Sequence, residues 1–169
     1  VENLLQEARA QARVNHPNVV HIYFVSRDEQ SPYLAMELIP GTTLQHRIEA
    51  GSLEYKDVVD IGLQIAEALR ASTRFDIVHG DIKPSNILLG EGLAKLSDFG
   101  LAQRLSRRDG ESGRIAGTPN YMAPEVCRGE PATAQSDMYS FGVMLFEMTF
   151  GRLPYNFDEA SIQSRLEAH

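Results

Sequence analysis

The sequence predicts an α+β fold, in which a small strand-containing part is followed by a larger and mostly helical part. Two short runs rich in β-forming residues, 19–25 and 33–38, lie near the start of the chain. Two longer segments with the apolar patterns of core helices, 58–72 and 136–150, follow later. Strands grouped before helices, rather than alternating with them, are typical of the α+β class.

The first residues of the chain have the pattern of an amphipathic helix. Apolar side chains recur at roughly helical spacing, and the pattern stops at His16 and Pro17, because the residue before a proline avoids helical backbone angles. The apolar positions are Leu4, Leu5, Ala8, Ala12 and Val14. The chain begins at Val1, inside this helix, so we expect it to be a fragment of a longer protein.

The two β-forming runs predict a hairpin, since only a short polar segment separates them. Pro40 and Gly41 end the second run. We therefore divide the chain there into a small part, 1–40, and a helical part, 41–169.

The helical part is predicted to start with two helices. Thr42 or Thr43 can cap a short helix that Gly51 ends, and a longer helix begins shortly after Ser52. One face of the longer helix is apolar, which indicates packing on a core. That face consists of Val58, Ile61, Ile65, Ala68 and Leu69.

Two short apolar runs, 86–90 and 94–98, predict a second hairpin with a tight turn between Gly90 and Gly92. Residues 101–119 show little periodicity and predict a long loop. The nearly all-apolar segment that follows predicts a deeply buried helix, which Gly151 ends.

Composition excludes several classes of protein. With 43% hydrophobic and 23% charged residues among 169, the chain has the composition of a folded domain. Its net charge of −7 argues against nucleic acid and anionic membranes as partners. The longest apolar stretch, 141–150, contains Glu147 and is too short to cross a membrane. The single Cys127 excludes an internal disulfide and favours a reducing, cytoplasmic location.

The chemistry-bearing residues lie in two short segments, HGDIKPSN (79–86) and SDFG (97–100). If the second hairpin brings them together, Asp81, Lys83, Asn86 and Asp98 converge. A carboxylate can accept a proton from a hydroxyl nucleophile, and Asn with a second carboxylate suits Mg²⁺. A lysine can neutralise a migrating phosphoryl group. These side chains together indicate phosphoryl transfer.

The order H-x-D-x-K-P-x-N, S-D-F-G, G-T-P-N-Y-M-A-P-E and S-D-M-Y-S-F-G resembles the signature set of eukaryotic-like serine/threonine protein kinases, in a bacterial form. The resemblance covers the whole chain and implies a kinase-like fold, with a partial N-lobe and an incomplete C-lobe. It implies that Asp81 is the catalytic base and that Lys83 contacts the transferred phosphate. Asn86 and Asp98 would hold Mg²⁺, and Thr118 would bridge Asp81 and Lys83.

The same resemblance implies an ATP site. Glu7 would pair with an ATP-contacting lysine, and Met36 would gate the back of the pocket. Backbone groups of Glu37 and Ile39 would bond adenine, and Leu88 would lie under its ring. The protein would then transfer the γ-phosphoryl group of ATP to Ser or Thr hydroxyls of a protein substrate.

The resemblance further implies a stacked column of side chains, formed by Ile22, Phe99 and His79. Gln11 stands where that column usually has an apolar residue. Asp137 would tie the last helix to the segment 79–86.

Two other functions compete with this reading. His-Gly-Asp followed by Asn86 also resembles aminoglycoside and choline kinases, which phosphorylate small molecules. Against these, D-F-G and the A-P-E segment are typical of protein kinases. A catalytically silent regulatory module is the other alternative, and the four intact residues of the phosphoryl-transfer set argue against it.

No G-x-G-x-x-G loop and no strand lysine precede Glu7 in this sequence. We therefore expect this chain to be a truncated, poorly active piece of an active kinase. Without preceding strands, the first hairpin would expose an edge and an apolar face, and we expect self-association through that surface.

Overall fold

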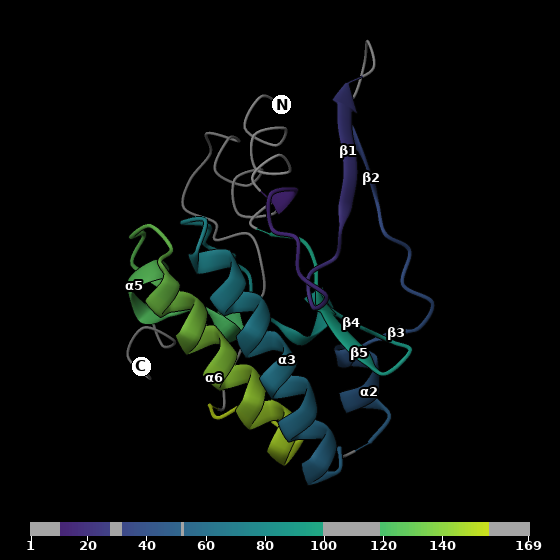
Figure 1. Cartoon of the computed structure of the whole chain (residues 1–169). Helices are drawn as coiled ribbons and strands as arrows, with labels where there is room; N and C mark the ends of the chain where they lie inside the picture. Colours follow the sequence, from purple (N-terminus) through teal and green to yellow (C-terminus); the bar gives the residue numbers. More distant parts are fainter. Residues whose placement is uncertain (1–10, 28–31, 52, 100–118, 156–169) are drawn as a thin grey trace.

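In a computed structural model, residues 11–27, 32–51, 53–99 and 119–155 are described, and the structural statements below concern them alone. The predicted α+β class is confirmed, with two small sheets beside a helical layer (Figure 1). The elements, in chain order, are β1 (Ile22–Arg27), β2 (Pro32–Met36), β3 (Thr42–Thr43), α2 (Leu44–Glu49), α3 (Tyr55–Thr73), the short 3-10 helix η1 (Pro84–Asn86), β4 (Ile87–Gly90), β5 (Leu93–Leu96), the 3-10 helix η2 (Pro119–Tyr121), α5 (Pro124–Cys127) and α6 (Ala134–Phe150).

β1 and β2 form the first predicted hairpin, but β1 begins at Ile22 rather than at Val19. Val19 and Val20 lie against the end of β5 instead. The Val20 amide donates to the Leu96 carbonyl at 2.9 Å, and the Leu96 amide donates to the Asn18 carbonyl at 2.8 Å. Both valine side chains are buried. This extended segment therefore fastens the first hairpin to the second sheet.

The second sheet is antiparallel, with strand order β3-β4-β5. The predicted hairpin β4–β5 turns at Glu91 and Gly92, whose φ angles of 52° and 78° are left-handed, as a two-residue hairpin turn requires. β3 is an addition to the prediction, because its two threonines both pair with β4 and precede a helix.

β2 ends at Met36 rather than at Leu38, and residues 37–41 continue without regular structure to β3. Gly41 passes very close to β4 on this path. A Cβ atom on Gly41 would lie 1.8 Å from the carbonyl oxygen of Leu89, so a residue with a side chain does not fit here.

The helices α2 and α3 start close to the predicted positions. Thr43, one of the two predicted caps, accepts a hydrogen bond from the His46 amide at 3.2 Å. α3 starts after Glu54, and Ser52 lies outside the described residues. The predicted apolar face of α3 packs on the core, with Ile61 only partly buried and the other four residues buried: Val58, Ile65, Ala68 and Leu69.

α6 starts slightly earlier than predicted, because Thr133 and Ser136 form a reciprocal capping box. It ends at Gly151, as predicted, where φ is 63°. The expectation of a deeply buried helix is wrong for part of its surface. Met138 and Phe150 are 55% and 60% exposed, because α6 packs through one side against α3 and the loop 79–86.

The core lies where α3, α6 and the second sheet meet. α3 and α6 run side by side, and α3 also packs on β5 (Figure 1). Fully buried side chains from these elements include Ile65, Ile87, Leu96, Met144 and Met148, and Leu44 of α2 joins the same core. The loop 79–86 lies between two parts of this core, because His79 and Gly80 contact α6 and Asn86 contacts Ser97 after β5.

His79 fixes the start of this loop inside the core. Its side chain is completely buried and packs against Phe99, with ring centroids 4.5 Å apart and ring planes tilted by 45°. Nε2 lies 2.9 Å from the Ser97 carbonyl oxygen, and Nδ1 lies 3.2 Å from the Asp81 amide. Because Nδ1 must accept and Nε2 must donate, the ring is the neutral Nε2-protonated tautomer. Burial lowers the pKa of His79 to about 4, more than the bond to Ser97 raises it.

Asp137 of α6 holds the same loop from the other side, as the sequence predicts. Its two carboxylate oxygens accept hydrogen bonds from the amides of His79 at 2.7 Å and Gly80 at 2.8 Å. Burial raises the pKa of Asp137 above its ordinary value, although both hydrogen bonds act in the opposite direction. Gly80 has a φ of 75°, which a glycine adopts without strain.

Some predicted features lie outside the described residues. They include nearly all of the first predicted helix with Glu7, and the long loop with Thr118. Within the described part, Ile22 is buried, and so is Gln11, which is 3% exposed. None of the helices described here is long and apolar enough to cross a membrane.

We predict that His79 makes folding stability sensitive to mild acid. The unfolded chain takes up a proton near pH 6.5, the ordinary histidine value, whereas folded His79 resists it down to about pH 4. Stability is therefore lost as pH falls through this window, by about 2 kcal/mol between pH 7 and 5. Urea unfolding of the wild type and of His79→Phe, each at pH 7 and at pH 5, measures this loss of stability. Equal acid losses in the two proteins would contradict the prediction.

Candidate functional site: a carboxylate, lysine and amide cluster

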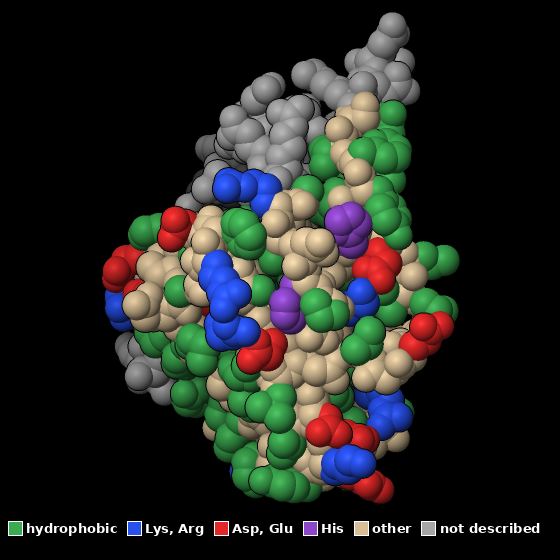
Figure 2. All heavy atoms as spheres, viewed as in Figure 1, with side chains coloured by type: hydrophobic (Ala, Val, Ile, Leu, Met, Phe, Trp, Pro, Cys, Tyr) green, Lys and Arg blue, Asp and Glu red, His purple; other side chains and the backbone are tan. Residues whose placement is uncertain are grey.

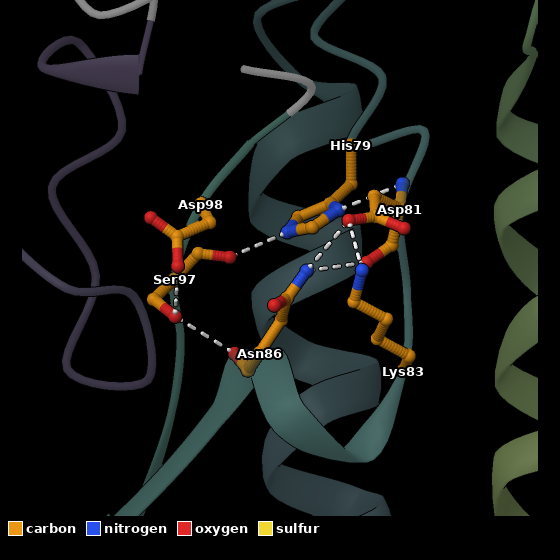
Figure 3. A network of polar contacts seen from close by, with 6 residues as sticks. All are labelled: His79, Asp81, Lys83, Asn86, Ser97 and Asp98. Atoms are coloured by element: carbon orange, nitrogen blue, oxygen red, sulfur yellow. Dashed lines mark hydrogen bonds and ion pairs between the residues drawn. The ribbon is translucent and has the colours of Figure 1, made fainter. Parts of the chain in front are cut away.

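The structure brings together the four residues that the sequence singles out for phosphoryl transfer. Asp81, Lys83 and Asn86 come from the loop 79–86, and Asp98 follows the end of β5 (Figure 3). Hydrogen bonds connect the loop directly to β5, because the Ser97 amide donates to the Asn86 carbonyl at 2.9 Å. The second hairpin is thus the element that places Asp98 beside the loop.

The Asp81 carboxylate is held through one of its two oxygens. Lys83 Nζ donates to Oδ2 at 2.7 Å, and Asn86 Nδ2 donates to the same oxygen at 3.0 Å. Oδ1 has no hydrogen-bond partner among the described residues. The Asp81 and Lys83 side chains are 21% and 20% exposed, so water and a substrate can reach them. This carboxylate is oriented and can still accept a proton at Oδ1.

Asn86 is buried, and three hydrogen-bond acceptors orient it: the main-chain carbonyls of Lys83 and Asp81, and Oδ2 of Asp81. Pro84 starts the short helix η1, and the Asn86 amide donates to the Lys83 carbonyl at 3.0 Å. Asn86 Nδ2 also donates to the main-chain carbonyl of Asp81 at 2.8 Å. Because Nδ2 is engaged with Asp81, the side-chain oxygen of Asn86 faces the side of Asp98 (Figure 3).

Asp98 has an exposed side chain on a strained backbone. Its φ is 59°, in the left-handed region that residues with a side chain rarely adopt. The Ser97 hydroxyl lies 3.4 Å from Asp98 Oδ2. Strain of this kind persists where the surrounding structure enforces it, which is common at functional sites.

Ser97 is a residue of this site that sequence reasoning missed. Its hydroxyl donates to the Asn86 carbonyl at 3.0 Å, and its own carbonyl lies 2.9 Å from His79 Nε2. It therefore connects the two ends of the loop 79–86 to β5. The sequence signal that could have identified Ser97 is its position directly before Asp98 in the S-D-F-G segment.

The oxygen atoms of Asn86 and Asp98 suit Mg²⁺, which binds to one or two protein oxygens and keeps water or phosphate as its other ligands. The described residues contain no group of three or more His, Cys, Asp or Glu side chains that could form a complete metal cage. A site completed by a nucleotide fits this donor set better than a permanent metal centre does.

The residues predicted to contact adenine lie on β2, the segment 37–41 and β4. Met36 pairs with Ile22 and is 48% exposed. The Glu37 amide donates to the His21 carbonyl at 2.8 Å, so of its two backbone groups the carbonyl is the candidate for adenine. Ile39 and the β4 residue Leu88 are half-buried. These positions are compatible with the predicted roles.

A pocket opens beside Asp81, between the loop 79–86, η2 and α6. Its wall includes Asp81, Tyr121, Met122 and Ser140. The Tyr121 hydroxyl donates to the Glu147 carboxylate of α6, and burial raises the pKa of both groups. This hydrogen bond fixes η2 against α6 next to the pocket.

The family model described as "protein kinase domain" matches residues 1–169. PrkC of Bacillus subtilis, a serine/threonine-protein kinase, is 37% identical over 163 residues, which is 95% of this chain and 25% of PrkC. PknL of Mycobacterium tuberculosis, also a serine/threonine-protein kinase, is 40% identical over 157 residues, 91% of this chain and 39% of PknL.

The fold comparison agrees. The crystal structure of Rad53 1–466 in complex with AMP-PNP matches with a TM-score of 0.78 and 29% identity, over 95% of this chain and 41% of that one. The chain spans about a quarter of the length of curated relatives such as PrkC. Since the family model matches the whole chain, the chain belongs to the protein kinase domain family, in its bacterial serine/threonine branch.

Proposed function

We propose that the protein is a serine/threonine protein kinase, which transfers the γ-phosphoryl group of ATP to Ser or Thr hydroxyls of a protein substrate. The observation that carries this proposal is the Asp81 carboxylate, held at Oδ2 by Lys83 and Asn86, while no described residue donates a hydrogen bond to Oδ1. The similarity to proteins named serine/threonine-protein kinases supports it. Protein kinases in general use ATP and Mg²⁺.

The Asp81 arrangement suits a base that takes the proton of an incoming hydroxyl. Oδ1 would accept the proton, while Lys83 and Asn86 keep the carboxylate oriented. Lys83, 2.7 Å from Oδ2, is also close enough to the reacting centre to neutralise charge on a migrating phosphoryl group. Thr118 would add a bridge between these two side chains.

Asn86 and Asp98 would hold Mg²⁺ through their side-chain oxygens. When bound, this ion would neutralise negative charge on the ATP phosphates. The exposed Asp98 carboxylate and the buried, fixed Asn86 amide would set the position of those phosphates relative to Asp81.

The remaining nucleotide contacts are assigned by family resemblance. The Glu37 carbonyl and the Ile39 amide would bond adenine, Leu88 would lie beneath its ring, and Met36 would border the back of the pocket. Glu7 would pair with a lysine supplied by a longer chain. We propose a cytoplasmic location for this part of the protein, with residues 1–40 as part of the N-lobe and 41–169 as part of the C-lobe.

We predict that Mg²⁺-ATP stabilises the chain through Asp98. A site filled to about 100 times its Kd adds roughly 2.7 kcal/mol to the free energy of unfolding. For a chain of this size we expect a rise in Tm of about 5–10 °C in the wild type. Asp98→Asn should abolish the rise. Asp60→Asn, on the exposed side of α3, is the matched control and should retain it.

Thermal unfolding with and without Mg²⁺-ATP measures this, and transfer of labelled γ-phosphate from ATP to a protein substrate by the full-length protein follows it. A shift that persists in Asp98→Asn would contradict the assigned role of Asp98. A full-length protein that transfers no phosphate to protein would overturn the proposed function.

We also propose that this 169-residue chain self-associates through the β1–β2 hairpin. Hydrophobic side chains gather on its surface (Figure 2), and Tyr23, Phe24 and Tyr33 are each at least half exposed. β1 and β2 form a two-stranded sheet, so each strand has an unpaired edge within the described residues.

We predict that the molar mass of the wild type, measured by light scattering, rises with protein concentration. In Phe24→Lys, which places a charge in this apolar surface, the molar mass should return to that of the monomer. A constant monomer mass at high concentration would refute this.

A further inference from the structure

An ion pair outside the catalytic cluster joins the segment 37–41 to β5. Lys95 Nζ donates to both carboxylate oxygens of Glu37, at 2.7 Å and 2.9 Å. The two side chains are only 13% and 25% exposed. Glu37 Oε2 also accepts a hydrogen bond from the His21 amide at 3.2 Å. Glu37 is therefore held through its carboxylate as well as through its amide.

This pair differs from the exposed ion pairs of the molecule. Arg47 and Asp57, which connect α2 to α3, are about half exposed, and such pairs contribute little to stability. Glu37 and Lys95 are more withdrawn from water, and their attraction must first offset the loss of hydration. Burial acts to raise the pKa of Glu37, but the hydrogen bonds from Lys95 and His21 lower it below its ordinary value, so the carboxylate is ionised at neutral pH.

The hairpin β4–β5 supports the segment 37–41 along its length. Near the turn, a Cβ atom on Gly90 would lie 2.8 Å from the Ile39 side chain and 2.9 Å from the Pro40 carbonyl oxygen. Further along, the approach is closer still, because a Cβ atom on Gly41 would lie 1.8 Å from the Leu89 carbonyl oxygen. The backbones therefore run in direct contact, and the Glu37–Lys95 pair fastens the end of this contact that lies nearest β2.

Lys95 also lies beside the proposed nucleotide site. It pairs with Leu88 across the antiparallel strands β4 and β5, so the two side chains share one face of the sheet. Beyond the end of β5 at Leu96, the chain continues through Ser97 to Asp98. One side chain thus contacts the residue whose carbonyl would bond adenine, and it neighbours the residue that would lie under the ring.

We propose that Lys95 is a positioning residue for the adenine group of the nucleotide. By holding the Glu37 carboxylate, Lys95 fixes the position of the Glu37 peptide relative to Leu88. The carbonyl of that peptide is the group that would bond adenine. The inference rests on the proposed function and deepens it. It concerns binding of the base, and it assigns Lys95 no part in proton transfer or in binding of the phosphates.

The test uses the full-length protein and separates base from phosphate binding. In Lys95→Met we expect KM for ATP to rise about tenfold with kcat within about twofold of the wild type. Affinity for adenosine should fall by a similar factor, and affinity for Mg²⁺-tripolyphosphate should not change. Lys95→Arg, which keeps a cation and donors for the carboxylate, should restore most of the ATP affinity.

Two further variants control for structural damage. Glu37→Gln should reproduce the effect of Lys95→Met, and the double variant should be no worse than either single one, because both remove one interaction. Arg47→Met breaks an ion pair remote from the site and should leave all constants unchanged.

An unchanged KM in Lys95→Met, or an equal loss of tripolyphosphate affinity, would overturn this inference while leaving the proposed function intact. A wild-type protein that neither binds Mg²⁺-ATP nor transfers its phosphate would overturn both.

Discussion

Two hydrogen bonds from the loop 79–86 to a single buried carboxylate are the constraint on which the site depends. Asp137 projects from α6, one of the two long helices that form the core, and accepts hydrogen bonds from the amides of His79 and Gly80. Removing a buried acceptor leaves two donors unsatisfied, which costs more than an ordinary hydrogen bond contributes. Asp137 therefore couples the packing of α6 to the backbone directly before Asp81.

The rest of the site builds on this fixed starting point. His79, neutral and buried, connects the loop to the end of β5 through Ser97, and Ser97 connects β5 to Asn86. The proposed base and the proposed metal ligands are thereby held relative to one another by hydrogen bonds that each include a main-chain carbonyl, so their geometry does not depend on flexible side chains alone. Preorganisation of this kind lowers the cost of aligning groups during reaction.

Sequence reasoning reached the parts of the fold that depend on local patterns. Hydrophobic periodicity predicted the apolar face of α3, and glycine positions predicted the β4–β5 turn and the end of α6 at Gly151. A sequence motif identified Asp81, Asn86 and Asp98. It misplaced the start of β1, because Val19 and Val20 are apolar whether they pair in a hairpin or pack against Leu96. It also missed Ser97 and Lys95, whose partners depend on contacts between segments far apart in sequence.

The claim that Asp137 holds the loop 79–86 is tested most directly by hydrogen exchange at the two amides that donate hydrogen bonds to its carboxylate. In Asp137→Ala, the exchange of the His79 and Gly80 amides should accelerate by about 10- to 100-fold, while amides in the middle of α3 keep their wild-type protection. That result would show that the carboxylate holds the loop locally. Unchanged exchange at both amides would contradict the account, because the loop would then be positioned without Asp137.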